Sequence, residues 1–136
     1  MKEKLVVWLI DDDDISKYVM KRKLKELSIK NVVDFPDSVE PLEILHKSSC
    51  DLKILPDLIL LDINMPLIDG FQFLDTYRGI KHKVKKDIPI YMLSSSLNPN
   101  DELRAKSFPE VLDYHIKPVA FEALQQMIET VVQEQV

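Results

Sequence analysis

The stretch Leu58-Ile59-Leu60-Leu61-Asp62-Ile63-Asn64-Met65-Pro66 decides the fold of this chain. Four consecutive aliphatic residues run into an aspartate, and a proline follows four positions later. A short, unbroken apolar run is typical of a strand that is buried on both faces, as in a parallel sheet. Asp62 stands where that strand should end, and open parallel sheets bind their ligands outside the carboxyl ends of the strands. Asp62 is therefore the first candidate for a functional residue.

Further apolar segments are predicted as strands, and a helical pattern follows each strand. The other strands are Leu5–Ile10, Asn31–Phe35, Ile88–Leu93 and Tyr114–Ile116. The helices cover the residues after Asp11–Asp14, Ser38 to about Lys47, Gly70 to Tyr77, Asn98 to about Phe108, and Phe121 to Val131. This alternation indicates a parallel sheet with helices on both faces. We predict an α/β fold, a three-layer α/β/α sandwich whose five-stranded parallel sheet has the flavodoxin-like order.

Capping residues mark the starts of the predicted helices. An aspartate of the run after the first strand caps the first helix, and Asp13 and Asp14 are assigned to capping or to solvent. Ser38 is predicted to cap the second helix. Asn98 is followed by a proline and, at the third helical position, by Asp101, which is a strong helix start.

Size and composition limit the class of protein. The chain has 136 residues, which fits one domain, and 46% of them are hydrophobic, enough for a real core. Its 18 basic and 23 acidic side chains give a net charge of -5 without a marked basic cluster, which argues against nucleic-acid binding. No apolar run is long enough to span a membrane, and the N-terminus lacks the pattern of a signal peptide. We expect a soluble cytoplasmic protein.

The one cysteine, Cys50, can form no internal disulfide. This suits a reducing compartment, and we expect Cys50 to be a buried or inert thiol.

Polar residues follow the predicted strands at the ends that a parallel sheet brings together. Asp11 and Asp12 follow the first strand, Asp62 ends the third, Ser94 follows the fourth and Lys117 follows the fifth. Neighbouring strands are only about 4.8 Å apart, so these side chains should share one small cleft. Three carboxylates at that distance repel one another, and some would hold protons unless a cation were present.

The residue types in this cleft point to phosphoryl chemistry. Mg²⁺ is usually held by one or two carboxylates together with phosphate oxygens and water. A lysine offers a point charge and a serine a neutral donor to phosphoryl oxygens. An aspartate can itself accept a phosphoryl group, and such a transfer depends mostly on positioning and charge neutralisation.

The chain resembles a response-regulator receiver domain of the stand-alone chemotaxis-protein type. The resemblance covers essentially the whole chain and rests on four motifs at four strand ends. They are Leu9-Ile10-Asp11-Asp12-Asp13, Leu60-Leu61-Asp62-Ile63-Asn64-Met65-Pro66 with Asp69-Gly70, Met92-Leu93-Ser94-Ser95, and Tyr114-His115-Ile116-Lys117-Pro118. Each motif is ordinary alone, but the four together are highly specific.

The resemblance implies a phosphorylation site with a bound magnesium ion. Asp62 would be the phosphorylated residue and a ligand of Mg²⁺. Asp12 would bind the ion directly, Asp11 would act beside it largely through water, and the backbone carbonyl of Asn64 would complete the protein's ligands.

The resemblance also implies roles on the fourth and fifth strands. Ser94 stands where the family has its switch hydroxyl, and Lys117 stands where it has its lysine. Tyr114 matches the aromatic switch position, and the Lys117–Pro118 bond would be cis.

A signalling role follows from the resemblance. A sensor histidine kinase or phosphotransfer protein would donate the phosphoryl group, and the module would not be an enzyme in the ordinary sense. The chain ends at Val136 after the last predicted helix, so we expect residues 1–136 to form a single receiver domain. Its output would be contact with a downstream protein, with neither nucleic acid nor membrane as partner, and we expect a monomer or weak dimer.

Two features depart from the family pattern or leave a choice open. Phe108-Pro109-Glu110-Val111-Leu112 stands where the family often has a Gly-Ala pair before the fifth strand. Four aspartates in a row leave the register of the acidic pair open by one residue. The apolar run ends at Ile10, which favours Asp11 and Asp12.

Two other functions compete with this interpretation. Asp11-Asp12-Asp13 also resembles the D-x-D motif of haloacid-dehalogenase-type Mg²⁺-dependent phosphohydrolases, with Asp11 as nucleophile. In that family a Thr or Val is usual where this chain has Ile15, and the motif around Asp62 would be unexplained. The other alternative is a receiver that acts as a phosphorylation-independent scaffold.

Overall fold

The computed structural model describes residues 4–48 and 50–134. Within these residues, five strands form a parallel sheet in the order β2-β1-β3-β4-β5. The strands are β1 (Val6–Ile10), β2 (Asn31–Phe35), β3 (Leu58–Asp62), β4 (Ile90–Ser94) and β5 (Val111–Ile116). The helices are α1 (Asp14–Glu26), α2 (Val39–Lys47), α3 (Gly70–Ile80), α4 (Pro99–Lys106) and α5 (Phe121–Glu134), with a short 3-10 helix η2 (Lys81–Lys83). The predicted α/β/α fold with flavodoxin-like strand order is confirmed.

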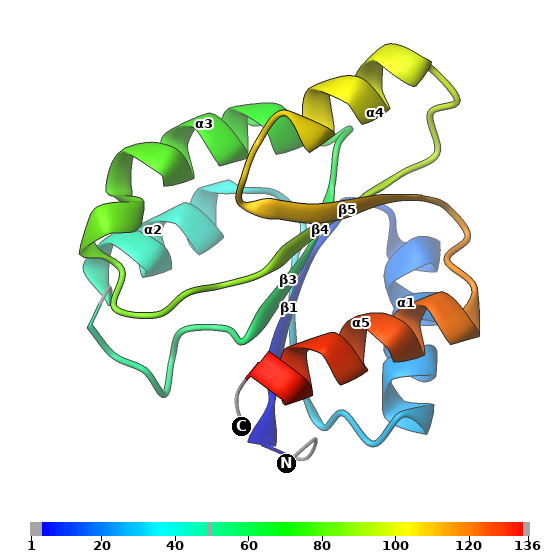
Figure 1. Cartoon of the computed structure of the whole chain (residues 1–136), viewed down its shortest axis with the longest axis horizontal. Coiled ribbons are helices and arrows are strands. Elements are labelled where there is room, and N and C mark those ends of the chain that lie inside the picture. Colours follow the sequence, from blue (N-terminus) through cyan, green and yellow to red (C-terminus); the bar gives the residue numbers. More distant parts are fainter. Residues whose placement is uncertain (1–3, 49, 135–136) are drawn as a thin grey trace.

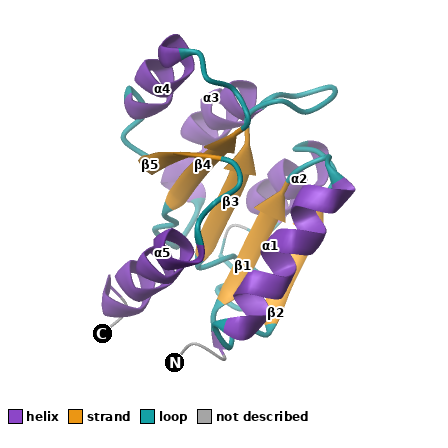
Figure 2. Ribbon diagram, turned by 90° about the vertical axis from the view of Figure 1, so that its right-hand side faces the viewer, coloured by secondary structure: helices purple, strands orange, loops and turns teal. Residues whose placement is uncertain are grey.

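The sheet lies between two layers of helices. Helices α1 and α5 cover one face, and α2, α3 and α4 cover the other (Figure 1). The view in Figure 2 shows the strands running between these two layers. Each layer closes its own hydrophobic core against the sheet.

Strand β3 runs through the middle of the sheet and explains the unbroken apolar run. Ile59 and Leu61 belong to the core on the side of α2 and α3, whereas Leu58 and Leu60 belong to the core on the side of α1 and α5. All four side chains are 0% exposed. Successive side chains of a strand point to opposite faces, so a strand covered on both sides needs apolar residues at every position.

Two strands begin two or more residues away from the predicted position. β4 begins at Ile90 rather than at Ile88, because Pro89 has no N–H group to donate into a strand pair. β5 begins at Val111 rather than at Tyr114. It lies at the edge of the sheet, where Leu112 and Asp113 are exposed. An edge strand carries no continuous apolar run, and its first half was therefore not evident from the pattern.

Two of the predicted helix caps form side-chain hydrogen bonds with the helix, and one does not. The carboxylate of Asp13 accepts hydrogen bonds from the backbone N–H groups of Ile15 and Ser16, and Asn98 accepts one from Asn100. Ser38 occupies the N-cap position of α2, as predicted, but its side chain does not cap the helix. Its backbone is α-helical rather than extended, so its hydroxyl makes no capping bond. That hydroxyl is buried and has no hydrogen-bond partner among the described residues.

The expectation of a buried Cys50 was also wrong, since Cys50 is exposed. It lies in the connection between α2 and β3, next to the exposed residues Asp51 and Leu52. Among the described helices, none has the length and apolar character needed to cross a membrane.

Candidate functional site

Asp62 is the last residue of β3 and lies in the middle of the sheet's carboxyl edge. The neighbouring strands are β1, which leads into Asp11, and β4, where Leu93 pairs with Asp62. The Asp62 side chain is held in a largely dry position, because the residue is only 6% exposed.

Glycine at position 70 brings the start of α3 against Asp62. A Cβ atom built on Gly70 would lie 2.7 Å from the backbone carbonyl oxygen of Asp62 and 3.0 Å from Met92 Cε. Asp69 caps the helix through a reciprocal box with Gln72, in which each side chain accepts from the other's backbone N–H. The loop after β3 is therefore fixed close to Asp62, and any side chain at position 70 would push it away.

Three carboxylates converge at this edge, as predicted from the strand ends. Asp11, Asp12 and Asp62 each offer an oxygen, and the three oxygens lie within 4.8 Å of one another. Asp11 is 1% exposed and Asp12 is exposed, so the cluster reaches from the interior to solvent. These are hard oxygen ligands with an open side, which fits a hydrated Mg²⁺ ion.

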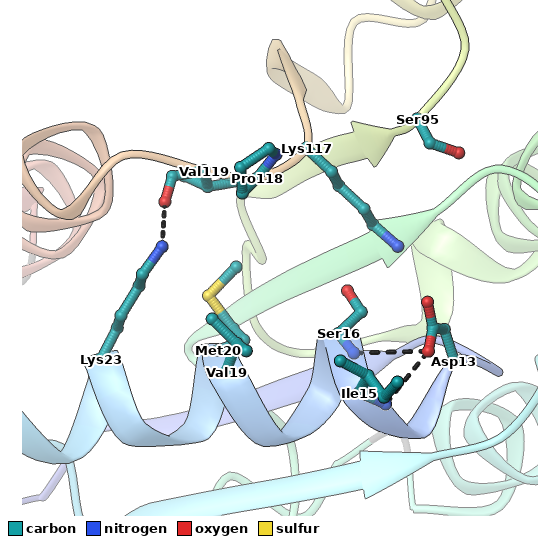
Figure 3. Close-up of a pocket in the computed structure, with 10 residues that line it drawn as sticks. All are labelled: Asp13, Ile15, Ser16, Val19, Met20, Lys23, Ser95, Lys117, Pro118 and Val119. Carbon is teal, nitrogen blue, oxygen red and sulfur yellow. Dashed lines mark hydrogen bonds between the residues drawn. The ribbon is translucent and has the colours of Figure 1, made fainter.

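The neighbouring Asp13 does not join this cluster. Its carboxylate turns to the first turn of α1 and accepts from Ile15 and Ser16 (Figure 3). Asp13 is also the third residue of the alternative D-x-D motif, and its use as a helix cap removes it from that role. The backbone N–H of Asp13 donates to Asp11 Oδ1 at 2.9 Å and so orients the Asp11 carboxylate.

Lys117 lies between two of these carboxylates. Its Nζ is 2.7 Å from Asp11 Oδ2 and 3.3 Å from Asp62 Oδ1, and its side chain is 16% exposed. Burial alone would lower the pKa of Lys117, but the hydrogen bond to Asp11 and the charge of Asp62 outweigh it and raise that pKa. The ammonium group is therefore firmly charged. The Lys117–Pro118 bond is cis, as the resemblance implied.

The electrostatics of Asp62 are unusual for an aspartate. Burial raises the pKa of its carboxyl group from 3.8 to about 6. Lys117 acts in the opposite direction, while the charges of Asp11 and Asp12 add to the rise. A bound cation would relieve the repulsion among these carboxylates and so stabilise the ionised form of Asp62.

Ser94 ends β4 and is 0% exposed. Its Oγ accepts a hydrogen bond of 2.9 Å from the backbone N–H of Ser96, and its carbonyl accepts one of 2.8 Å from the N–H of Lys117. Ser94 thus lies on the strand beside Asp62 and is tied to both the loop that follows β4 and the residue that ends β5.

Tyr114 is buried in β5, at 7% exposure. Its hydroxyl group has no hydrogen-bond partner among the described residues. The resemblance implied an aromatic switch at this position, and this structure holds the ring buried.

A hollow of about 290 Å³ adjoins the site between α1 and the residues after β5 (Figure 3). Its lining is mainly apolar and includes Ile15, Val19 and Pro118. Lys23 closes one end, where its Nζ donates to the carbonyl of Val119. Ile15 is 76% exposed, so the hollow opens onto an apolar surface beside the carboxylates. The sequence analysis did not anticipate this surface, because it joins residues of α1 to Pro118 and Val119 after β5.

The family model of the response regulator receiver domain matches residues 7–129. A solved two-component response regulator from Cytophaga hutchinsonii superposes with a TM-score of 0.83 at 27% identity, covering 94% of this chain and 96% of that one.

Two curated proteins show the same similarity. A probable methanogenesis regulatory protein, FilR2, from Methanothrix harundinacea is 25% identical over 96% of this chain and 83% of its own length. The sensor histidine kinase CheAY of Helicobacter pylori is 30% identical over 90% of this chain, which spans only 14% of that protein. The chain belongs to the receiver domain family of two-component response regulators.

Proposed function

We propose that residues 1–136 act as a single receiver domain that accepts a phosphoryl group on Asp62 from a sensor histidine kinase or a phosphotransfer protein. One observation carries the proposal: Lys117 Nζ lies 3.3 Å from the buried Asp62 carboxylate, in a cluster with Asp11 and Asp12. Such a grouping of charges is costly to maintain in a purely structural role.

The reaction is a displacement at phosphorus. A carboxylate oxygen of Asp62 forms the new P–O bond as the P–N bond to the donor's imidazole breaks, and the imidazole nitrogen keeps the electron pair. Charge on the transferred oxygens must be neutralised, and most of the catalysis consists of positioning and electrostatic stabilisation. Lys117 supplies a positive charge at the site, and the Ser94 hydroxyl supplies a neutral donor.

The donor set suits Mg²⁺. Asp11, Asp12, Asp62 and the backbone carbonyl of Asn64 would hold the ion, which supplies charge neutralisation when bound. The close approach of three carboxylate oxygens, within 4.8 Å, supports this assignment. Asp11 and Asp12 are the acidic pair after β1, because Asp13 is engaged as a helix cap.

The output would be protein–protein contact. A phosphoryl group adds close to two negative charges at the strand ends. Ser94 would turn toward it, and Tyr114 would stabilise the state in which the surface of α4, β5 and α5 binds a downstream protein. The phosphodonor would approach from the side of α1, where exposed Ile15 and Val19 lie beside the site. We infer a signalling module, whose only reactions are its own phosphorylation and dephosphorylation, acting as a monomer or weak dimer.

Labelling with a small phosphodonor tests the proposal. Incubation with acetyl phosphate and Mg²⁺ should add one phosphoryl group, located on Asp62 by borohydride trapping and peptide mapping. Asp62→Asn should abolish labelling, whereas Asp75→Asn, an exposed change on α3, should leave it intact. A label on Asp11, or normal labelling of Asp62→Asn, would contradict the proposal and favour the phosphohydrolase alternative.

A further inference from the structure

A chain of hydrogen bonds connects Ser94 with the first turn of α4. The backbone N–H of Ser96 donates to Ser94 Oγ at 2.9 Å, and Ser96 Oγ donates to Asp101 Oδ2 at 2.8 Å. Ser96 Oγ also accepts from the backbone N–H of Asn98 at 3.1 Å. These bonds leave Ser96 with little freedom, although it lies in a loop.

The direction of these bonds matters for the Ser94 hydroxyl. In the bonds made by the described residues, Ser94 Oγ is an acceptor, and the N–H of Ser96 occupies one of its two lone pairs. The hydroxyl hydrogen can therefore point elsewhere. A donor of this kind is what a phosphoryl oxygen on the adjacent strand end requires.

Asp101 is not needed to cap α4. Asn98 is the N-cap, and its side chain accepts from the backbone N–H of Asn100. Pro99 occupies the first helical position, which lacks an N–H group to satisfy. The Asp101 carboxylate instead accepts from Ser96, so its contact is with the loop that orients Ser94.

We propose that Asp101 is a positioning residue for the switch hydroxyl, acting through Ser96 on Ser94. The bond between Asp101 and Ser96 fixes the loop after β4, and the loop directs the Ser94 hydrogen toward a phosphoryl group on Asp62. Asp101 belongs to α4. The same series of hydrogen bonds therefore moves the first turn of α4 when Ser94 binds the phosphoryl group. This inference deepens the proposed function and rests on it.

A double-mutant cycle tests this role, with beryllofluoride as the probe. Beryllofluoride in the presence of Mg²⁺ imitates the phosphoryl group on Asp62, and its affinity would be measured for wild type, Ser94→Ala, Asp101→Ala and the double variant. A hydrogen bond contributes about 0.5–1.5 kcal/mol, so Asp101→Ala should weaken binding by about two- to twelvefold. In the Ser94→Ala background the same change should have almost no effect, because residues that act through one another are not additive.

Two further variants separate positioning from helix stability. Ser107→Ala removes the hydrogen bond from Ser107 Oγ to the carbonyl of Arg104 at the other end of α4, and it should leave beryllofluoride affinity unchanged. Asp101→Asn keeps an oxygen that accepts from Ser96 and should bind within about twofold of wild type. Amide signals of α4 should shift on binding in wild type and Asp101→Asn, but much less in Asp101→Ala.

The outcomes distinguish this role from the proposed function. Additive effects of Ser94→Ala and Asp101→Ala, or an equal loss in Asp101→Asn or Ser107→Ala, would overturn the positioning role while the phosphorylation of Asp62 stands. If wild type bound no beryllofluoride, or if Asp62→Asn bound it equally well, both the positioning role and the proposed function would be overturned.

Discussion

Lys117 Nζ lies 2.7 Å from Asp11 Oδ2 and 3.3 Å from Asp62 Oδ1, so one ammonium group serves two buried carboxylates. Its shorter contact is with Asp11, the more buried of the two. Burial raises the pKa of Asp62, the charges of Asp11 and Asp12 add to the rise, and the more distant Lys117 only partly offsets it. The residue proposed to react is also the residue whose charge is least satisfied.

Replacing Lys117 with methionine should impair both stability and reaction. The change leaves Asp11 and Asp62 without their cation, and removing one partner of a buried pair costs about 3 kcal/mol. In chelator at pH 7, urea unfolding should show a loss of that order. With acetyl phosphate and Mg²⁺, labelling of Asp62 should fall at least tenfold. Lys106→Met is the control, since Lys106 pairs with Glu102 on the surface and the variant should lose almost no stability. Equal losses in the two variants would contradict this assignment.

Replacing Asp62 with asparagine should stabilise the metal-free protein at neutral pH. The pKa of the Asp62 carboxyl group is about 6 in the folded chain, against 3.8 for an ordinary aspartate. The folded state binds the proton more tightly than the unfolded state. The free energy of unfolding therefore falls as pH rises from 3.8 to about 6, and the full loss of stability is present above that range. Asp62→Asn should gain on the order of 1–3 kcal/mol at pH 7 and almost nothing at pH 4.

Urea unfolding at both pH values in chelator measures this gain. Asp75→Asn, on the exposed side of α3, is the control and should show no such pH dependence. A gain of the same size at pH 7 and pH 4 would mean that the charge of Asp62 is not its cause.

Most of the site could be predicted because its residues are tied to strand ends. A parallel sheet brings the residues after β1, β3, β4 and β5 to one edge, so Asp11, Asp62, Ser94 and Lys117 had to lie close together once the strands were assigned. The relative distances to Lys117 Nζ could not be predicted, because they depend on side-chain packing across the sheet. The choice of Asp13 as helix cap, which leaves Asp11 and Asp12 for the site, was favoured by the end of the apolar run at Ile10.

Some side-chain contacts between loops and helices were not predictable from local sequence patterns. Glu110 looks like a surface acid in a loop, yet its side chain is 5% exposed and lies 3.3 Å from Arg78 Nη2 and 3.6 Å from Lys81 Nζ. The hydrogen bond between Ser96 and Asp101 could not be predicted either, because Asp101 has the sequence position of an ordinary acid in a first helical turn. Neither pair has a periodic signal, since both depend on how α4 and the loops beside it pack.

Magnesium should raise the thermal stability of the protein through the carboxylate cluster. A ligand that binds only the folded state stabilises it, and here it also relieves repulsion among Asp11, Asp12 and Asp62. Asp12→Ala should remove most of the rise in Tm seen on adding excess Mg²⁺. Asp14→Ala is the matched control, because the Asp14 side chain is 97% exposed and lies outside the cluster. An unchanged response in Asp12→Ala would move the direct metal ligand to another aspartate.

Replacing Glu110 with glutamine should destabilise the connection between α3 and β5. Burial would raise the pKa of Glu110, but its backbone hydrogen bond, Arg78 and Lys81 together hold that pKa below the usual 4.5 of a glutamate. The stabilisation is therefore present at neutral pH and is lost as pH falls through the lowered pKa. We expect a loss of about 1–2 kcal/mol at pH 7, measured by urea unfolding, that shrinks at low pH. A loss that does not change with pH would contradict the ionic origin.

Replacing Tyr114 with phenylalanine separates the hydroxyl of this residue from its ring. The hydroxyl is buried without a partner among the described residues, and leaving such a group unpaired costs about 1–3 kcal/mol. Tyr114→Phe should therefore leave stability unchanged or raise it by about 1 kcal/mol in thermal unfolding. A clear loss of stability would show that the hydroxyl has a partner in solution.

Phosphorylation of Asp62 should change the surface formed by α4, β5 and α5, and Ser94 and Tyr114 should transmit this change. Beryllofluoride can change partner affinity only if the partner binds the two states differently, so a pull-down with and without it identifies the output. Ser94→Ala should leave labelling of Asp62 possible but weaken the dependence of partner binding on beryllofluoride, because the donor that responds to the phosphoryl group is gone. Tyr114→Ala should weaken it as well, since the ring fills the space beside β5. If both variants keep full phosphorylation-dependent binding, the signal leaves the site by another face.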